Sequence, residues 1–222
     1  MTRSKTLRTL SVILLCLLAL AQLVGCGDGY RMTMKDGSYY IRATGVYYKP
    51  APLTYMPIGK GDTPYAVYKY DGGSELYYKI AANVDPEQYI ALVFEDYVSG
   101  LMHAADLTLP TFREFDADRA LITTNTEVWA SMGEAKTKED VDFILDAFEA
   151  GERVQYPASE ALETYRIMFT SEKFPAFTMT LRYYYYGEGR TYLYDIGTRE
   201  CRVVPDGILD DFLPDDDGGV GV

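Results

Sequence analysis

Few side chains in this sequence could perform catalysis, and the most reactive are a single histidine and the single cysteine outside the first 26 residues. His103 lies in the apolar run 101–105, and Cys201 stands before Arg202-Val203-Val204 in a β-rich run. A cysteine nucleophile needs a base such as histidine, so these two residues are the one such pair that the body of the chain could form. Both residue types are also common in protein cores, and the apolar neighbours favour a structural role for each.

Metal-dependent and serine-dependent chemistry lack the residues that they need. Zinc sites use several Cys or His ligands, and the sequence has neither a CxxC motif nor a second histidine. It has no GxSxG motif. Asp116-Ala117-Asp118 and Asp215-Asp216-Asp217 lack the spacing and closing Glu of a calcium-binding EF-hand loop. Gly187-Glu188-Gly189-Arg190 reads as a turn rather than a phosphate-binding loop, because no helix pattern follows it. The sequence therefore predicts no metal and no cofactor.

A pair of carboxylates is the remaining route to catalysis. Glu114 and Asp116 lie two residues apart in an irregular segment around Pro110 and could supply the acid and base of a hydrolase. The chain contains 33 Asp and Glu residues, so such pairs also arise without any catalytic purpose. A hydrolase of this kind is kept as an alternative.

The sequence specifies location better than chemistry. Residues 1–25 have the organisation of an export signal, with a basic start, an apolar run from Leu10 to Ala21 and a small-residue end. The apolar run is shorter than the roughly 20 residues that a membrane-spanning helix needs. It ends in Leu23-Val24-Gly25-Cys26, which is an aliphatic residue, a variable residue, a small residue and a cysteine.

This tetrapeptide resembles the lipobox of bacterial lipoproteins. The resemblance implies that the signal is cut before Cys26, that the Cys26 thiol is diacylated, and that the chain is held on the extracytoplasmic face of the cell membrane. Two acyl chains suffice for stable anchoring without a spanning helix. An ordinary cleaved signal with an incidental cysteine is the alternative. Residues 26–29 would then form a short tether that keeps the folded part close to the membrane.

The mature chain, residues 26–222, would be strongly acidic. The full sequence has a net charge of −12, and the signal removes three Lys or Arg and no Asp or Glu, which gives −15. Such a chain is a poor partner for nucleic acid, and anionic lipid headgroups should repel it, which leaves the acyl chains as the membrane contact. Cys201 is the one cysteine left, so no intramolecular disulfide is possible. A hydrophobic content of 48% predicts a packed core.

Residues 30–134 are predicted to form a β-rich N-terminal half. Asp36-Gly37 and Asp71-Gly72 each lie between β-rich runs, a strong hairpin signal because Gly adopts positive φ readily. The arms of these hairpins are expected at residues 30–34, 39–43, 65–70 and 75–80. Residues 46–48 are expected to extend the second strand beyond a bend at Gly45, and residues 50–61 to form a loop.

The rest of this half is less regular. Residues 89–94 form a short apolar run, which favours a buried strand over a helix opened by Asp85-Pro86. Residues 101–104 would pair with it across a turn at Ser99-Gly100. Residues 108–118 are expected to be irregular, and residues 119–124 suit either a short strand or a short helix.

Residues 135–214 are predicted to form a helix, four strands and a short terminal helix. Thr137 followed by Asp140 is a capping signal, and Gly151 stands where a helix would end. Four apolar residues share one face of this helix: Val141, Ile144, Leu145 and Phe148. Short turns separate four β-rich runs, which predicts an antiparallel meander over residues 165–170, 177–186, 191–194 and 201–204.

The predicted fold class is α+β, with antiparallel β meanders, one packed amphipathic helix and a short C-terminal helix starting at Pro205-Asp206. The acidic tail, residues 215–222, is predicted to be disordered. The order of elements, chiefly from Thr137 to Leu213, resembles that of small Gram-positive extracytoplasmic lipoproteins of unknown function. This is a resemblance of pattern, and it implies no catalytic residues.

Tyrosine is in excess, with 21 residues, four of them consecutive at 183–186. Strand alternation puts two sets of side chains on opposite faces of the run 177–186. The first set is apolar and expected against the helix: Phe177, Met179, Leu181, Tyr183 and Tyr185. The second is expected to be an exposed recognition face, unless the fold covers both sides: Thr178, Thr180, Arg182, Tyr184 and Tyr186. Arg182, Tyr184 and Tyr186 are the predicted binding residues, with Arg182 stacked on a tyrosine ring.

Taken together, the sequence predicts a membrane-anchored extracytoplasmic lipoprotein that is a non-enzymatic recognition module for a protein or cell-envelope ligand. The alternatives are an envelope hydrolase using Glu114 and Asp116, and a structural accessory subunit of an envelope complex.

Overall fold

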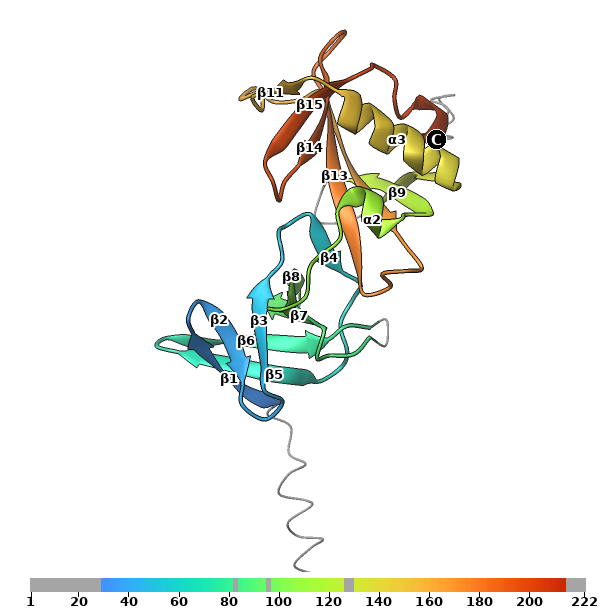
Figure 1. The fold of residues 1–222 in the computed structure, drawn as a ribbon. Helices are drawn as coiled ribbons and strands as arrows, with labels where there is room; N and C mark the ends of the chain where they lie inside the picture. The colour runs from blue at the N-terminus through green and yellow to red at the C-terminus, as the bar shows by residue number, and fades with distance from the viewer. Residues whose placement is uncertain (1–28, 82–83, 95–96, 126–129, 215–222) are drawn as a thin grey trace, which may run out of the picture.

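The computed structural model describes residues 29–81, 84–94, 97–125 and 130–214. The predicted signal peptide, Cys26 and the acidic tail lie outside these residues. The described chain is mostly β-structure, arranged as a closed barrel and a second, open sheet, with few helices (Figure 1). Among these residues, no helix is long and apolar enough to cross a membrane.

The N-terminal strands close into a seven-stranded barrel. Around the barrel the strands follow the order β1 (Tyr30–Lys35), β2 (Ser38–Ile41), β3 (Val46–Pro50), β8 (Tyr97–Ala104), β7 (Tyr89–Phe94), β6 (Gly73–Lys79) and β5 (Pro64–Tyr70). Parallel pairing of β1 with β5 closes the ring. Tyr48 and Tyr77 fill its interior beside Met32, Ile41 and Ile90. Both predicted Asp-Gly hairpins are confirmed, and Asp36 and Gly37 have the positive φ angles that a tight hairpin turn needs.

Two expectations for the barrel are wrong. Residues 46–48 do not extend the second strand, because the chain reverses at Gly45 (φ +76°) and β3 pairs antiparallel with β2. Residues Ser99 and Gly100 do not form a turn. Strand β8 starts at Tyr97, which pairs with Phe94, so Ser99 and Gly100 lie inside the strand. The register between β7 and β8 shifts by one residue at Leu92 and Val93, as in a β-bulge.

The second sheet contains the predicted four-stranded meander. Its order is β10 (Ser131–Ala135), β9 (Arg119–Thr124), β12 (Glu163–Thr170), β13 (Phe177–Tyr185), β14 (Thr191–Asp195), β15 (Glu200–Val204) and β11 (Arg153–Val154). Strands β9 and β10 belong to this sheet, so the division between the two sheets does not coincide with the predicted boundary at residue 134. Strand β10 was not predicted. Its Gly133 lies so close to the backbone of Phe212 that a Cβ would stand 1.9 Å from the Phe212 oxygen.

A three-residue strand connects the barrel to the second sheet. Strand β4 (Tyr55–Pro57) lies in the segment predicted to be a loop, and it pairs with the first half of β13, with Pro57 opposite Phe177 and Tyr55 opposite Met179. The segment between β3 and β5 therefore leaves the barrel and adds a strand to the other sheet (Figure 1).

The predicted helix is present as α3 (Lys138–Ala150). Thr137 Oγ1 accepts a hydrogen bond from the Asp140 amide (3.2 Å), and the Asp140 carboxylate accepts one from the Thr137 amide (3.1 Å), which completes a capping box. The four residues of its apolar stripe are buried: Val141, Ile144, Leu145 and Phe148. Gly151 follows the helix in an extended conformation, and glycine is needed there because a Cβ would lie 2.3 Å from the Val203 oxygen.

Two smaller helical elements complete the fold. Helix α2 (Phe112–Phe115) occupies part of the segment expected to be irregular, and its Phe115 stacks against both Phe174 and Phe177. The expected terminal helix is only one 3-10 turn, η1 (Asp210–Phe212), although Ile208 and Leu209 before it are buried. The larger of the two apolar cores contains buried residues of α3, of the second sheet and of the barrel.

Candidate functional site

Two arginines lie side by side on the face of the second sheet opposite α3. Arg166 on β12 and Arg182 on β13 are directly opposite each other in the antiparallel register, and both are half-buried. Burial lowers the pKa of the Arg166 guanidinium, and the neighbouring charge of Arg182 lowers it further. Like charges in such a position repel each other, so an anion bound between them would be favoured.

A pocket of about 180 Å³ opens onto this arginine pair, and we call it the arginine pocket. Arg166, Thr180 and Arg182 line it from the second sheet, and Ser99 lines it from barrel strand β8. Leu53 and Met56, from the segment that carries β4, and Ile196 complete the lining. The pocket therefore lies where the barrel and the second sheet meet, a position at which ligand sites are common.

Thr180 gives the arginine pocket an unused hydrogen-bonding group. Its side chain is only 3% exposed, and its Oγ1 has no hydrogen-bond partner among the described residues. A buried hydroxyl without a partner costs about 1–3 kcal/mol, and the residue that carries this one lines the pocket. Thr123, the register partner of Arg166 on β9, also has a buried Oγ1 that finds no partner in the part of the chain that the structure describes.

The wall of the pocket is held by the β4 segment. The Thr54 carbonyl accepts a hydrogen bond from the Thr180 amide (2.8 Å), and the Thr54 hydroxyl donates to the buried Asp195 carboxylate. Asp195 also accepts a hydrogen bond from the Gly197 amide (2.9 Å). A Cβ on Gly197 would lie 2.2 Å from Thr54 Oγ1, so this turn needs glycine to approach the segment.

The expectation that Tyr184 and Tyr186 form an exposed face is wrong. They are 6% and 5% exposed, because other tyrosines cover them. Tyr156, from the segment after β11, lies with its ring centroid 5.3 Å from that of Tyr184, and Tyr192 lies 5.6 Å from Tyr186. Tyr156 itself is 40% exposed, and partial burial raises the pKa of its phenol.

Arg182 contacts this tyrosine cluster through a hydroxyl. Its Nη1 donates a long hydrogen bond of 3.5 Å to the Tyr184 hydroxyl, which is the polar tip of that ring. A phenol hydroxyl is a neutral partner, so this contact orients the guanidinium without cancelling its charge.

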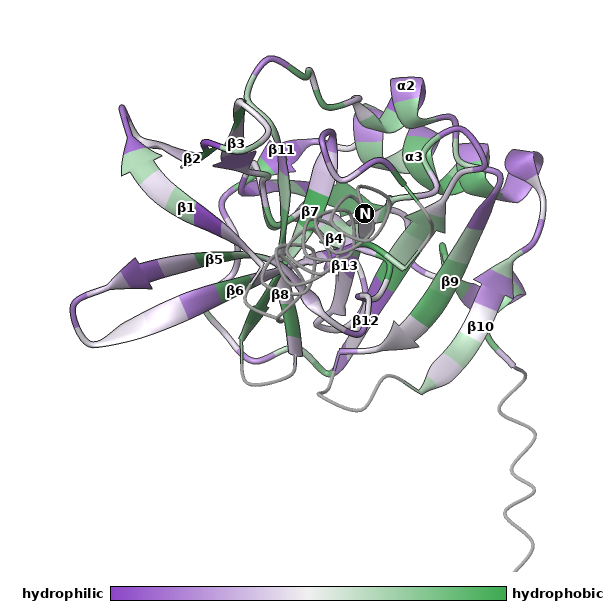
Figure 2. Cartoon of the chain, turned by 90° about the horizontal axis from the view of Figure 1, so that it is seen from below, coloured by the Kyte–Doolittle hydropathy of each residue, from purple (hydrophilic) through white to green (hydrophobic). Residues whose placement is uncertain are grey.

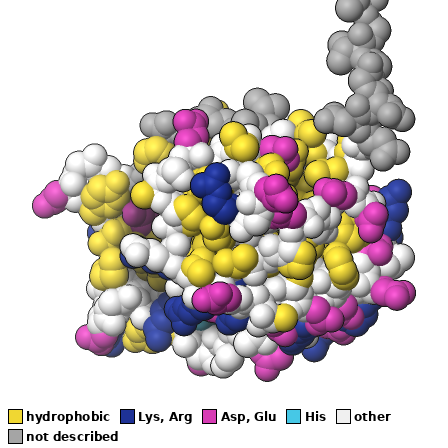
Figure 3. All heavy atoms as spheres, turned by 90° about the horizontal axis from the view of Figure 1, so that it is seen from above, with side chains coloured by type: hydrophobic (Ala, Val, Ile, Leu, Met, Phe, Trp, Pro, Cys, Tyr) yellow, Lys and Arg dark blue, Asp and Glu magenta, His cyan; other side chains and the backbone are white. Residues whose placement is uncertain are grey.

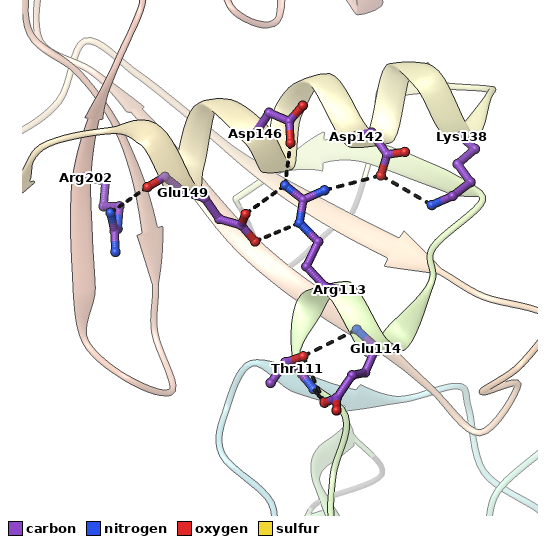
Figure 4. A network of polar contacts seen from close by, with 8 residues as sticks. All are labelled: Thr111, Arg113, Glu114, Lys138, Asp142, Asp146, Glu149 and Arg202. Carbon is purple, nitrogen blue, oxygen red and sulfur yellow. Dashed lines mark hydrogen bonds and ion pairs between the residues drawn. The ribbon is translucent and has the colours of Figure 1, made fainter.

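The two carboxylates of the alternative hydrolase both make local contacts, and those of Glu114 are shown in Figure 4. Glu114 accepts hydrogen bonds from the Thr111 amide and hydroxyl, both at 2.9 Å, and these bonds lower the pKa of the Glu114 carboxyl. A general acid requires the opposite shift. Asp116 forms an ion pair with Lys138 (3.1 Å). Glu114 therefore serves the capping box of α2, and Asp116 serves an ion pair with α3.

Arg113 of α2 makes ion pairs with three acidic residues of α3: Asp142, Asp146 and Glu149 (Figure 4). These residues follow the spacing of one helix face, so a single guanidinium on α2 contacts about two turns of α3. This network is exposed and joins the two helices.

His103 and Cys201 are not brought together, because they lie in β8 of the barrel and in β15 of the second sheet. Burial lowers the pKa of His103 and raises the pKa of the Cys201 thiol to about 11. A thiol with a raised pKa stays protonated and is a poor nucleophile. Within the described part of the chain, no group of three or more His, Cys, Asp or Glu is placed to hold a metal ion.

No protein-family model matches this chain, and searches of curated proteins and of solved structures found no match. Its function is therefore inferred from the geometry of the arginine pocket.

Proposed function

We propose that this chain is a lipid-anchored, extracytoplasmic binding module and that the arginine pocket is its ligand site. The observation that carries the proposal is the arginine pair, Arg166 and Arg182, facing a pocket with the unpartnered, buried hydroxyl of Thr180. The export signal and the lipobox-like residues ending at Cys26 support the location. Of the predicted binding residues, Arg182 keeps a direct role, and Tyr184 becomes its support.

The ligand group that fits this site is a small anion, a carboxylate or a phosphate, carried by a protein or cell-envelope ligand. Guanidinium groups bind both through paired N–H donors, and the Thr180 hydroxyl adds one more donor. A pocket of about 180 Å³ admits one such group rather than a large molecule. In a chain with a net charge of −12, this local positive site would distinguish an anion from a neutral ligand.

We also infer that α3 is the packed helix that supports the sheet behind the site. Its buried stripe shares one core with Leu181 and Tyr183, which alternate with Arg182 along β13. A rigid strand fixes the direction of the side chains on its other face, so the helix would set the position of Arg182 without touching it.

Thermal denaturation with added anions tests the proposal. Inorganic phosphate and acetate are titrated at constant ionic strength against the parent, Arg182→Gln and the control Arg119→Gln, an exposed arginine on β9. A ligand at about 100 times its Kd stabilises the native state by about 2.7 kcal/mol, so the parent and the control should melt at higher temperature with anion. Arg182→Gln should lose this response. An equal response in Arg182→Gln would refute the proposed site.

A pull-down from native membranes extends the test to the natural ligand. The parent and Arg119→Gln should recover the same molecules, whereas Arg182→Gln should lose those that carry the anionic group. Retention of every partner by Arg182→Gln would show that recognition occurs elsewhere.

A further inference from the structure

The acidic charge of this chain is distributed unevenly. Residues 30–104, which include all seven barrel strands, contain seven Lys or Arg and eight Asp or Glu, a net charge of −1. Residues 105–222 contain eleven basic and twenty-four acidic residues, a net charge of −13. Acidic side chains are spread over the face seen in Figure 3, which looks onto the end of the molecule that carries α3.

The outer face of the barrel has a hollow with two cations at its edge. Arg31, Val67 and Leu76 are opposite one another across β1, β5 and β6, on the side away from the buried Met32, Ala66 and Tyr77. Here a hollow of about 470 Å³ has Pro64, Val67 and Leu76 as its apolar floor and Arg31 and Lys69 at its edge. We call it the basic hollow. None of the ion pairs among the described residues involves Arg31 or Lys69.

The basic hollow lies beside the point where the chain would meet the membrane. Gly29 lines the basic hollow and is three residues from Cys26. Three residues of extended chain span at most about 10 Å, so a lipid on Cys26 would lie within that distance of Gly29. Figure 2, seen from the barrel end, shows hydrophilic stretches on β1 and β5.

We propose that the basic hollow binds the headgroup of an anionic phospholipid, with Arg31 and Lys69 on the phosphate and the apolar floor against the first carbons of the lipid. The site is separate from the arginine pocket and goes beyond the proposed function. It also changes the expectation that anionic headgroups repel the chain. The field of a membrane falls off within about 8 Å at physiological salt, so the charge of the nearest face decides the contact, not the net charge.

Vesicle flotation tests this contact without the acyl chains. The protein is the chain 26–222 with Cys26→Ser, which contains every described residue and cannot be acylated. At low salt it should float with vesicles of phosphatidylcholine and phosphatidylglycerol and remain behind with phosphatidylcholine alone. Raising the salt should release it, because the attraction is electrostatic.

A pair of matched variants locates the contact. Arg31→Gln with Lys69→Gln should lower the partition coefficient about 25-fold, since each basic group near an anionic bilayer contributes about a factor of five. Arg119→Gln with Arg153→Gln makes the same change of charge on exposed residues of the second sheet and should leave partitioning unchanged. Circular dichroism checks that both variants fold.

Two results would overturn the proposal: equal flotation of the parent with both kinds of vesicle, or equal losses in the two double variants. Neither result bears on the anion response of Arg182, so a failure here is distinguishable from a failure of the proposed function.

Discussion

Replacing Phe148 by Ala should destabilise the protein by about 3 kcal/mol. Truncation of a buried Phe costs about 3–5 kcal/mol, because apolar transfer energy is lost and a cavity remains. Phe148 is 7% exposed and lies near the C-terminal end of α3. Its ring contacts Phe112 (centroids 6.1 Å apart) and the Arg202 guanidinium (5.6 Å). Since Arg202 can move into part of the space, the cost should fall at the low end of the range.

Urea unfolding followed by circular dichroism measures this loss in the free energy of unfolding. In a thermal melt, a loss of about 3 kcal/mol should lower the melting temperature by roughly 6–12 °C in a chain of this size. Asp142→Ala is the control on the exposed side of the same helix. Asp142 makes ion pairs with Arg113 (3.5 Å) and Lys138 (3.3 Å), but all three side chains are more than a third exposed, so the loss should stay within about 1 kcal/mol. Equal losses in the two variants would mean that α3 does not dock through the Phe148 face.

The remaining predictions concern the anchor, the tyrosine cluster and the two reactive side chains. Cys26→Ala should release the protein from membranes or leave its precursor uncut, and a cut Cys26→Ala protein that still fractionates with membranes would contradict lipidation. Changing Tyr184 and Tyr186 together to Ser should destabilise the fold by several kcal/mol, because both rings are buried, and unchanged urea unfolding would refute their role in packing. His103→Ala and Cys201→Ser should leave anion binding intact, and loss of binding by a variant with a normal melting temperature would implicate that residue. The Cys201 thiol, with its pKa raised to about 11, should resist iodoacetamide at pH 8 until the protein is unfolded.

Local signals in the sequence predicted local structure well. The Asp-Gly turns, the Thr137 capping box and the β-rich runs after residue 160 each depend on neighbouring residues, and all are present. Strand β4 could not be found in this way. It has three residues and ends in Pro57, and its pairing with β13 depends on residues more than a hundred positions away.

For the candidate site, too, sequence signals could not predict contacts between residues that are far apart in the chain. Alternation correctly divided residues 177–186 into two faces, but it could not tell that Tyr156 would cover one of them. Alternation placed Arg182 on the face that carries the proposed site, but it could not place Arg166 opposite Arg182, because that pairing is fixed by the register between β12 and β13. A cross-strand register is a property of the assembled sheet and is not contained in the pattern of either strand.

The short strand that joins the two sheets has a consequence for how the protein is made. Met56 accepts a hydrogen bond from Thr178, 122 residues later, and Thr54 bonds to Asp195, 141 residues later. A ribosome adds about 5–20 residues per second, so β4 waits several seconds for its partners to be synthesised. The arginine pocket is lined from both sides of this junction, and the last of its lining residues to be synthesised is Ile196. Under the proposed function, anion binding would therefore report the moment when the chain has folded as far as Ile196, and a chain truncated after the barrel would not bind.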